Sequence, residues 1–522
     1  MTSAFALAWI LTSQSTFAWM YGSDSADYTG YPSSLIRTSD GGYAFTGYTK
    51  ATGYEDIIAV RLSPAGDVLW AKRFSPTVND RGDRGYSIAQ TSDGGFVIAG
   101  FTLSFNSYDI MLLRLNSSGG LLWAKTYGGA QPEEAYSVIR TAEGGFALGG
   151  FIVSAAGTPE DFCALKLNAD GSLVWAKTFG GTGSEKGRAI AQTSDGGFVL
   201  VGETKSYGSV SSYEILVLKM RSDGSREWAE AFGSTVASFP DYAYSVGCVG
   251  DTVFVGAYTL ASAGNNDFLV LKLNPDGTRN WAKLAGGSVG GRQDLLWSMA
   301  PTSDRGLVCV GQTTSYGTGS DDFFVVRLSP EGNMVWARTC GGLGSDIAYS
   351  VVQTSDGGYA IFGQTQSAGA AKGDLLLLKL DPSGNHSYGA CVPACYPDLA
   401  VPTVNTTPVT DNTNPWTPTV TDRTASMTVS DLPLHRANFC EALYEGVEEG
   451  YNPSQHWITA TALPGGLLFV SHEDADIRVY SGDGRLVCSE RLIRGKSWFP
   501  LGQGVYFWIA GGQGFKGKAV VR

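Results

Sequence analysis

The chain has 522 residues, of which 43% are hydrophobic and 16% charged, and its formal net charge is −12. It is long enough to bury a large core, and its 69 glycines and 12% aromatic residues are typical of a turn-rich all-β protein. The acidic balance argues against a nucleic-acid partner, because a broad phosphate contact needs a basic surface.

The N-terminus carries an apolar run over residues 4–11, followed by Ser15-Thr16-Phe17-Ala18, which resembles a signal-peptidase site. The run is too short to span a bilayer, and we expect no transmembrane segment. A signal peptide also needs a basic start, yet the first basic residue is Arg37. Residues 1–15 are therefore either a signal peptide that lacks its beginning or an ordinary buried strand.

A repeat occupies residues 16–385. Its clearest copy runs from Gly85 to Gly100, and the acidic residue of its turn recurs seven times at intervals of about fifty residues, at Asp40, Asp93, Glu143, Asp195, Asp251, Asp304 and Asp356. A second phrase, clearest at residues 123–129, carries a tryptophan that recurs at Trp19, Trp70, Trp123, Trp175, Trp228, Trp281 and Trp336. Short strands repeated at this period indicate a β-propeller.

One repeat contains four predicted strands, for example residues 86–91, 96–102, 109–115 and 121–127, joined by glycine-containing turns. The seventh repeat ends after three strands, and residues 16–21 supply a matching fourth. The sequence therefore predicts an all-β, seven-bladed propeller that the N-terminal strand closes. The recurring tryptophans are expected to pack between neighbouring blades.

The predicted loops divide between two faces. Short turns such as Ser-Asp-Gly-Gly form one face, which we call the fixed-turn face. Loops of variable length form the other, the variable-loop face, and binding residues commonly lie on such loops. We expect a glycan or protein ligand to contact the tyrosines of these loops, which are Tyr54, Tyr108, Tyr207, Tyr213 and Tyr316.

Acidic residues recur where the third strand of each blade begins, at Asp56, Asp109, Asp161, Glu214, Asp267, Asp322 and Asp374. They form either a ring of carboxylates for cations or basic ligands, or loop-closing residues that accept backbone N–H bonds. The sevenfold regularity favours the structural role, because functional sites break symmetry.

Catalytic signals are scarce. All four histidines, His386, His435, His456 and His472, follow the propeller, so the ring has no histidine-based triad or metal cluster. We therefore assign no catalytic residue, no cofactor and no metal, and expect a monomeric, non-enzymatic binding or adhesion protein. The alternative is a secreted hydrolase that uses carboxylates on the variable-loop face.

The cysteines fall into two groups. Cys163, Cys248, Cys309 and Cys340 lie in or at the ends of repeat strands and are expected to be buried thiols. Cys440 is expected to pair with Cys391 or Cys395 across an irregular segment, as in an extracytoplasmic protein.

Residues 386–454 are rich in Thr and Pro and predict an extended spacer, which could still lie along the propeller. Residues 455–522 predict five short strands, a hairpin turn at Ser481–Gly484 and a small β-sandwich.

The C-terminal strands carry Gly484-Arg485 in a hairpin, then Gly504-Val505-Tyr506, and Lys518 in a last strand. In this order, they resemble the type A C-terminal sorting domain of type IX secretion. The resemblance implies the type IX machinery as a partner and a secreted or outer-surface location. The repeats resemble secreted bacterial β-propeller repeat proteins with Thr-Ser-Asp-Gly-Gly-Tyr and Trp-Ala-Lys-Thr-Tyr-Gly-Gly motifs, and more distantly kelch repeats.

Overall fold

A computed structural model describes residues 16–386 except for short loops, and thereafter only the strands of residues 391–521. The loops outside the described residues are 23–26, 30–33, 51–52, 77–80, 105–107, 154–156, 208–211, 235–239, 263–264, 288–290, 318–319, 343 and 368–373. The described elements are all β-strands, and among them is no helix that is long and apolar enough to cross a membrane. The predicted signal segment, residues 1–15, lies outside the described residues.

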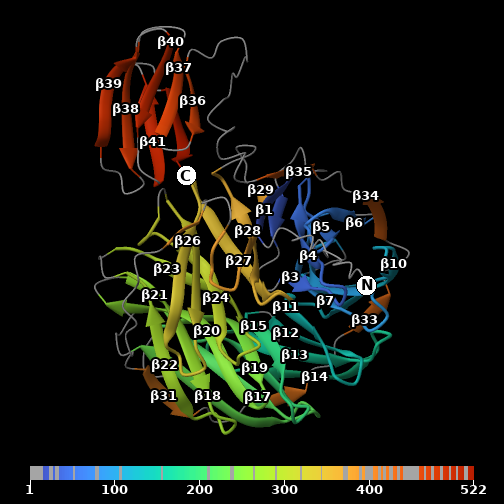
Figure 1. The fold of residues 1–522 in the computed structure, drawn as a ribbon. Helices are drawn as coiled ribbons and strands as arrows, with labels where there is room; N and C mark the ends of the chain where they lie inside the picture. The colour runs from blue at the N-terminus through green and yellow to red at the C-terminus, as the bar shows by residue number, and fades with distance from the viewer. Residues whose placement is uncertain are drawn as a thin grey trace, which may run out of the picture. The chain divides into compact units, whose positions relative to one another are not determined.

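Seven antiparallel sheets form the blades, and each contains four strands in the predicted order (Figure 1). The first strands are β2 (Asp27–Thr29) with β3 (Leu35–Arg37), β7 (Asp83–Gln90), β11 (Glu133–Arg140), β15 (Glu185–Gln192), β19 (Tyr242–Val249), β23 (Asp294–Pro301) and β27 (Asp346–Gln353). The second strands are β4 (Tyr43–Thr49), β8 (Phe96–Thr102), β12 (Phe146–Val153), β16 (Phe198–Thr204), β20 (Thr252–Ser262), β24 (Leu307–Thr313) and β28 (Tyr359–Thr365).

The third strands carry most of the core, because several of them, such as β9 and β17, are buried along their whole length. They are β5 (Asp56–Leu62), β9 (Asp109–Leu115), β13 (Glu160–Leu167), β17 (Glu214–Met220), β21 (Asn265–Leu273), β25 (Asp322–Leu328) and β29 (Asp374–Leu380). The fourth strands are β6 (Val68–Pro76), β10 (Leu121–Gly128), β14 (Leu173–Phe179), β18 (Arg226–Ser234), β22 (Arg279–Ala285), β26 (Met334–Cys340) and β1 (Phe17–Gly22). Blades are numbered 1 to 7 from β3 to β27.

The predicted ring closure is confirmed. Strand β1 pairs with β29 of blade 7, with Trp19 opposite Leu377. The buried Tyr21 of β1 donates its hydroxyl to the carbonyl of Gly66 in blade 1, at 2.6 Å. On the inner strands, the Leu35 N–H of blade 1 donates to Ser350 Oγ of blade 7 at 3.2 Å. The two ends of the repeat array are thus joined in one ring, which removes two sheet edges.

The tryptophans pack between blades, as predicted. Trp70 donates its indole N–H to the carbonyl of Ser117 in the next blade and meets Phe96 edge-on. A Cβ on the turn residue Gly119, whose φ is 81°, would lie 2.9 Å from the Trp70 ring. Glycine at this turn is therefore required both by its backbone conformation and by the indole that covers it.

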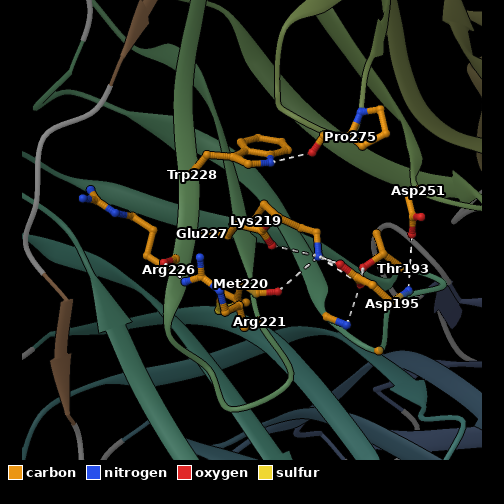
Figure 2. Close-up of polar contacts among 12 residues, drawn as sticks. Thr193, Asp195, Lys219, Met220, Arg221, Arg226, Glu227, Trp228, Asp251 and Pro275 are labelled. Atoms are coloured by element: carbon orange, nitrogen blue, oxygen red, sulfur yellow. Dashed lines mark hydrogen bonds and ion pairs between the residues drawn. The ribbon is translucent and has the colours of Figure 1, made fainter.

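Turns on the fixed-turn face are held by a cation from the third strand. In blade 4, Lys219 Nζ lies 2.7 Å from Asp195 Oδ2, and the Thr193 hydroxyl donates to the same carboxylate (Figure 2). Blade 5 departs from the pattern, as the sequence indicates, because its Asp251 accepts a bond from the Asp195 N–H instead. Figure 2 also shows Trp228 donating to the carbonyl of Pro275 in blade 5, at 2.8 Å.

Residues of the predicted spacer add a fifth, outer strand to six blades (Figure 1), and we call this set of strands the belt. In chain order the belt pairs with blades 6, 4, 3, 2, 1 and 7. Its strands are β30 (Cys391–Pro393), β31 (Val404–Pro408), β32 (Thr413–Pro415), β33 (Thr419–Asp422), β34 (Met427–Asp431) and β35 (His435–Asn438). The extended spacer therefore lies along the propeller, and its last strand covers the closing strand β1.

One cysteine prediction is wrong. Cys340 is disulfide-bonded rather than a thiol, whereas Cys163, Cys248 and Cys309 are free, as predicted. Cys340 ends β26, and the belt strand β30 places Cys391 directly opposite it. The repeat pattern could not show this, because the partner strand comes from outside the repeats.

The chain divides into two compact units, residues 1–443 and 444–522. The second unit contains two antiparallel sheets. One consists of β36 (Ile458–Leu463), β37 (Gly466–Ser471) and β40 (Gly495–Pro500), and the other of β38 (Ala475–Ser481), β39 (Leu486–Leu492), β41 (Gly504–Ala510) and β42 (Phe515–Val521).

The hairpin predicted near Ser481 joins β38 to β39. Of the sorting motif, Gly504, Val505 and Tyr506 begin β41, and Lys518 lies opposite Phe507. Gly484 and Arg485 lie outside the described residues.

Candidate binding site at one end of the channel

A β-bulge interrupts the first strand of six blades at the same place, about three residues from the variable-loop face. In blade 2 the pairing shifts between Gly85 and Ser87, so Tyr86 has no partner on β8. A bulge leaves one residue unpaired and redirects its side chain. The first strands of all seven blades line the central channel of the propeller. We therefore call the bulged residues the channel ring; they are Tyr86, Tyr136, Arg188, Tyr244, Trp297 and Tyr349.

Side-chain contacts join the six residues of the channel ring in an arc from Tyr86 to Tyr349. Tyr86 stacks on Tyr136 with ring centroids 5.0 Å apart. The Arg188 guanidinium carbon lies 4.7 Å from the centre of the Tyr136 ring and 5.5 Å from that of Tyr244. Trp297 continues the arc, 4.8 Å from Tyr244 and 6.2 Å from Tyr349.

Blade 1 contributes the second-strand residue Tyr48 beside this arc. The Arg84 guanidinium carbon lies 4.7 Å from the Tyr48 ring centre, beside Tyr86. Burial raises the pKa of Tyr349 to about 12, and Tyr48 and Asp321 add to the rise. Burial likewise raises the pKa of Tyr86 and Tyr136, and that of Tyr258, which stacks on Tyr244. These phenols stay neutral at physiological pH and can donate hydrogen bonds.

The symmetry of the ring is broken in blade 4. Arg188 replaces an aromatic residue there, and its Nη2 lies 2.5 Å from an oxygen of Glu203, which is 2% exposed. Sister blades carry Tyr48, Phe101, Phe151, Tyr258, Gln312 and Gln364 at the position of Glu203. Glu203 holds the pKa of Arg188 well above its usual value although burial opposes this.

Charge is concentrated on one side of the ring. The residue two places before the bulge is Arg84, Glu134 or Lys186 in blades 2 to 4, but Tyr242, Leu295 or Ile347 in blades 5 to 7. Burial raises the pKa of Glu134, against the lowering effects of the Tyr136 hydroxyl and Arg188. Tyr136, Arg188 and Tyr349 are half-buried, whereas Tyr86, Tyr244 and Trp297 are 6 to 8% exposed. The accessible part of the ring therefore combines aromatic side chains with the ionisable groups of blades 2 to 4, which suits a ligand with apolar and polar parts.

The five predicted tyrosines occupy different settings. Tyr108 lies 5.3 Å from Phe101, and Tyr213 lies 5.6 Å from Tyr242, so both border the channel ring. Tyr207 and Tyr316 donate their hydroxyls to the carbonyls of Gly180 and Gly286 and so fasten their loops. Tyr54 is 54% exposed on its loop. A role of any of the five in ligand binding stays a prediction.

The predicted acidic ring lies inside the propeller, because most of its members are no more than 9% exposed, among them Asp56, Asp109, Glu214, Asp267 and Asp322. A second set of acids begins the first strands, at Asp83, Glu133, Glu185, Asp294 and Asp346, each ten residues before the turn acid. This second set accepts loop N–H bonds. Glu185, for example, accepts from Gly181 and Ser206.

The two sets of acids meet between blades. A Cβ on Gly128 would lie 2.5 Å from Asp109 Oδ1 and 2.9 Å from Glu133 Oε2. Burial, with the charge of Asp109, raises the pKa of Glu133 to about 8, and burial, with Asp294, raises that of Asp267 to about 7. These carboxyls are buried packing groups, and no set of three or more His, Cys, Asp or Glu side chains suited to a metal ion occurs in the described part of the chain.

A family model described as a domain of unknown function (DUF5122) beta-propeller matches residues 251–280, in blade 5. No curated protein matches the sequence.

Similar solved structures include a protein of unknown function from Bacteroides caccae, at 12% identity over 62% of this chain and 93% of that one, with a TM-score of 0.31. Another is a periplasmic gluconolactonase from Pseudomonas aeruginosa, at 12% identity over 62% and 95% of the two chains, with a TM-score of 0.40. A puromycin hydrolase mutant shares 13% identity over 70% of this chain and 53% of that one, with a TM-score of 0.43.

The channel ring was missed in the sequence. Its signal was available, because the bulged residue always stands seven positions before the turn acid. At that position, Arg188 is the single non-aromatic residue of blades 2 to 7, and Glu203 is the single acid at the facing position. Two residues that differ from their equivalents in every other blade and also pair with each other, such as Arg188 and Glu203, indicate a site more strongly than tyrosines on loops do.

Proposed function

We propose that the protein is a non-enzymatic binding module and that its ligand is a glycan, held at the variable-loop end of the channel. The observation that carries this proposal is the arc of contacts in the channel ring with its single charged interruption, Arg188 with Glu203. Aromatic faces pack against the C–H faces of sugar rings, while tyrosine hydroxyls and charged groups bond sugar hydroxyls. A purely structural ring would have no need to replace one aromatic residue by a buried ion pair, which stabilises little on balance.

The test is a glycan array probed with the purified full-length protein. The informative variants are Tyr136→Ala and the double variant Arg188→Gln/Glu203→Gln, which removes both charges but keeps a hydrogen-bonding pair. We expect both to lose binding at least tenfold while the melting temperature changes little for the double variant. Tyr54→Ala, on an exposed loop, is the comparison. Loss of binding in Tyr54→Ala alone would move the site from the ring to the loop tips.

The alternative is a secreted hydrolase. Its best candidate is Glu134, a half-buried residue at the ring whose pKa is raised by burial, and Glu203 is a second acid at the ring although it is only 2% exposed. A hydrolase screen with wild type, Glu134→Gln and Glu203→Gln decides between the two functions. Turnover that either substitution abolishes would replace the binding proposal.

We also propose that the protein is exported by a type IX system to the outer surface or the medium, on the resemblance of residues 455–522 to a sorting domain. A reporter fused to these residues should leave a host that has the type IX machinery. A Lys518→Ala fusion tests the motif, and a wild-type fusion that stays in the periplasm would contradict the proposal.

A further inference from the structure

The Arg188 side chain of the channel ring is held from three directions. Its Nε and Nη2 both donate to the carboxylate of Glu203 in the same blade, with Nε 3.1 Å from Oε2 and Nη2 2.5 Å from Oε1. The guanidinium carbon lies 4.7 Å from the ring centre of Tyr136 in blade 3 and 5.5 Å from that of Tyr244 in blade 5. Because the guanidinium is planar and its donors have fixed directions, these contacts fix the orientation of the whole group.

One edge of this guanidinium remains available. Of its five N–H groups, Glu203 accepts one from Nε and one from Nη2, which leaves both of Nη1 and the second of Nη2. In the described part of the chain, Arg188 has no second ion-pair or hydrogen-bond partner, and Nη1 is not one of the fully buried polar atoms that lack a partner. The Arg188 side chain is 14% exposed and that of Glu203 only 2%. The Nη1–Nη2 edge is therefore the part of the pair that a ligand can reach.

Two kinds of oxygen pair fit two neighbouring N–H donors of one guanidinium. A carboxylate fits them, and so do two hydroxyl oxygens on neighbouring carbons of a sugar ring. The shape of the edge does not separate an acidic sugar from an uncharged one, so the surrounding charge decides.

The cations of blades 2 to 4 at the ring are already neutralised. Each of them has an ion pair with a carboxylate of its own, at 3.1 Å or less. The pairs are Arg84 with Glu55, Lys186 with Glu160, and Arg188 with Glu203.

Glu134 adds a further acid beside Arg188. It is half-buried on β11, and no ion pair joins it to a cation among the residues that the structure describes. Burial raises its pKa, while Arg188 and the Tyr136 hydroxyl lower it, so its carboxyl group lies within the field of this guanidinium. An acidic sugar on Arg188 would be the third carboxylate around one positive charge, and juxtaposed like charges weaken binding strongly.

The other charged groups near the ring lie farther from Arg188 along the chain and across the channel. Lys205 is exposed on its loop, with its ammonium 4.2 Å from the ring centre of Tyr213. On the far side, Asp321 accepts from Gln312 Nε2 at 2.7 Å and from Ser345 Oγ at 3.0 Å, which are neutral donors. No excess of positive charge therefore surrounds the edge of Arg188.

We propose that the glycan presents an uncharged sugar unit to the channel ring, and that two neighbouring hydroxyl oxygens of this unit accept hydrogen bonds from the Nη1–Nη2 edge of Arg188. Glu203 is a positioning residue, because it neutralises and orients the guanidinium from the buried side. Glu134 accepts a bond from a sugar hydroxyl and repels an acidic sugar. This assignment of the sugar class rests on the proposed function.

The test adds matched oligosaccharides, which differ only in the oxidation of C6, to the glycan array. The pairs are oligomers of glucose and glucuronate, of mannose and mannuronate, and of galactose and galacturonate. We expect the full-length protein to bind the neutral member of at least one pair about tenfold or more tightly than its acidic counterpart. Tighter binding of the acidic member would overturn this inference and leave glycan binding intact, whereas no binding to any glycan of the array would overturn both.

Variants of the two acids test the origin of the selectivity. Glu203→Gln and Glu134→Gln should each raise the ratio of acidic to neutral affinity about tenfold, because each removes a carboxylate that opposes an acidic sugar. The ratio does not depend on the fraction of protein that is folded. Glu331→Gln is the matched control, since it removes an exposed acid on the fixed-turn face. An equal change of the ratio in Glu331→Gln would show that general surface charge causes the selectivity, and the assignment would be wrong.

Arg188→Lys separates the paired donors from the charge. Lysine keeps the positive charge but replaces the planar edge by a single ammonium group. We expect the neutral member to bind about tenfold more weakly and the ratio of acidic to neutral affinity to stay within about twofold. Unchanged binding of the neutral member in Arg188→Lys would contradict the proposed pair of hydrogen bonds.

Discussion

Arg305 follows the acidic residue in the turn between the first and second strands of blade 6. Five other blades have a glycine at this position, namely Gly41, Gly94, Gly144, Gly196 and Gly357. The φ of Arg305 is 66°, and it is the single non-glycine residue with positive φ in the described part of the chain. The left-handed region costs an ordinary L-residue about 1 to 2 kcal/mol, part of which the larger unfolded-state entropy of glycine offsets.

Arg305→Gly is therefore expected to raise the free energy of unfolding by about 0.5 to 1 kcal/mol, as measured by thermal or denaturant unfolding. Gly94→Ala is the reverse experiment. A Cβ there meets nothing closer than 3.9 Å, so only the backbone strain of its φ of 79° is tested. A destabilised Arg305→Gly variant would show that the arginine side chain makes a contact that outweighs the strain.

The buried acids between blades make stability depend on pH. The pKa of Asp267 is raised by burial and Asp294 from 3.8 to about 7, so the folded chain binds this proton more tightly than the unfolded chain. That stabilisation is complete below the ordinary pKa and is lost as the pH rises toward 7. Turn acids act in the opposite direction, because Thr91 and Arg114 lower the pKa of Asp93 to about 2, and its contribution is lost only in stronger acid.

We expect the melting temperature to fall by a few degrees between pH 5 and pH 8, and Asp267→Asn to reduce this difference by raising the value at pH 8. Asp223→Asn is the control, because this exposed turn acid has a lowered pKa and does not titrate in that interval. An unchanged slope in Asp267→Asn would show that the pKa of Asp267 is not raised in the folded protein.

At the scale of elements, the four strands of each blade could be predicted because pattern and turn chemistry agree within one repeat. The recurring tryptophans also predicted the packing between blades, whereas the contact of Trp70 with the turn glycine Gly119 is seen only in the structure. The belt could not be predicted, because strands of three to five residues carry little pattern of their own. Their pairing depends on blade edges hundreds of residues away, such as Ala437 opposite Met20.

The belt also gives a prediction about the disulfide. Directly opposed residues in an antiparallel pair lie within disulfide range, so we expect Cys340 to be bonded to Cys391. Cys340→Ser and Cys391→Ser should each lower the free energy of unfolding by roughly 2 to 4 kcal/mol, and the double variant by no more than either. Cys248→Ser, which removes a free cysteine, is the matched control. A double Cys340→Ser/Cys391→Ser variant that loses the sum of the two single losses would show that these cysteines are not bonded to each other.

At the scale of the whole molecule, β1 lies between β29 and β35, so one strand joins the first repeat, the last repeat and the end of the belt. Deleting residues 1–22 exposes the edges of two strands and removes the buried Tyr21. We expect the melting temperature to fall by about ten degrees or more, because the deletion removes a whole strand that is paired on both of its edges. A chain that lacks residues 1–15 alone is the control, and equal melting of the two truncated chains would contradict closure by β1.

The sequence predicted on which face of the propeller the candidate site lies, but not which residues of the channel ring form it. Loop variability predicts that ligands bind on the variable-loop face, and this stays a prediction. Tyr108 and Tyr213 of these loops contact Phe101 and Tyr242, which lie beside the channel ring. The ring itself depends on a bulge, which shifts pairing by one residue and has no signature in composition. The charge pair of Arg188 and Glu203 is visible in the sequence only once the two positions are known to face each other.

The central claim, that the channel ring binds a glycan without cleaving it, is tested most directly by a crystal structure of the protein with its best ligand from the array. We expect an intact sugar at the variable-loop end of the channel, packed against Tyr86 or Tyr136 and hydrogen-bonded to the Arg188 side of the ring. A sugar bound only at the loop tips near Tyr54, or a cleaved sugar beside Glu134, would contradict the claim.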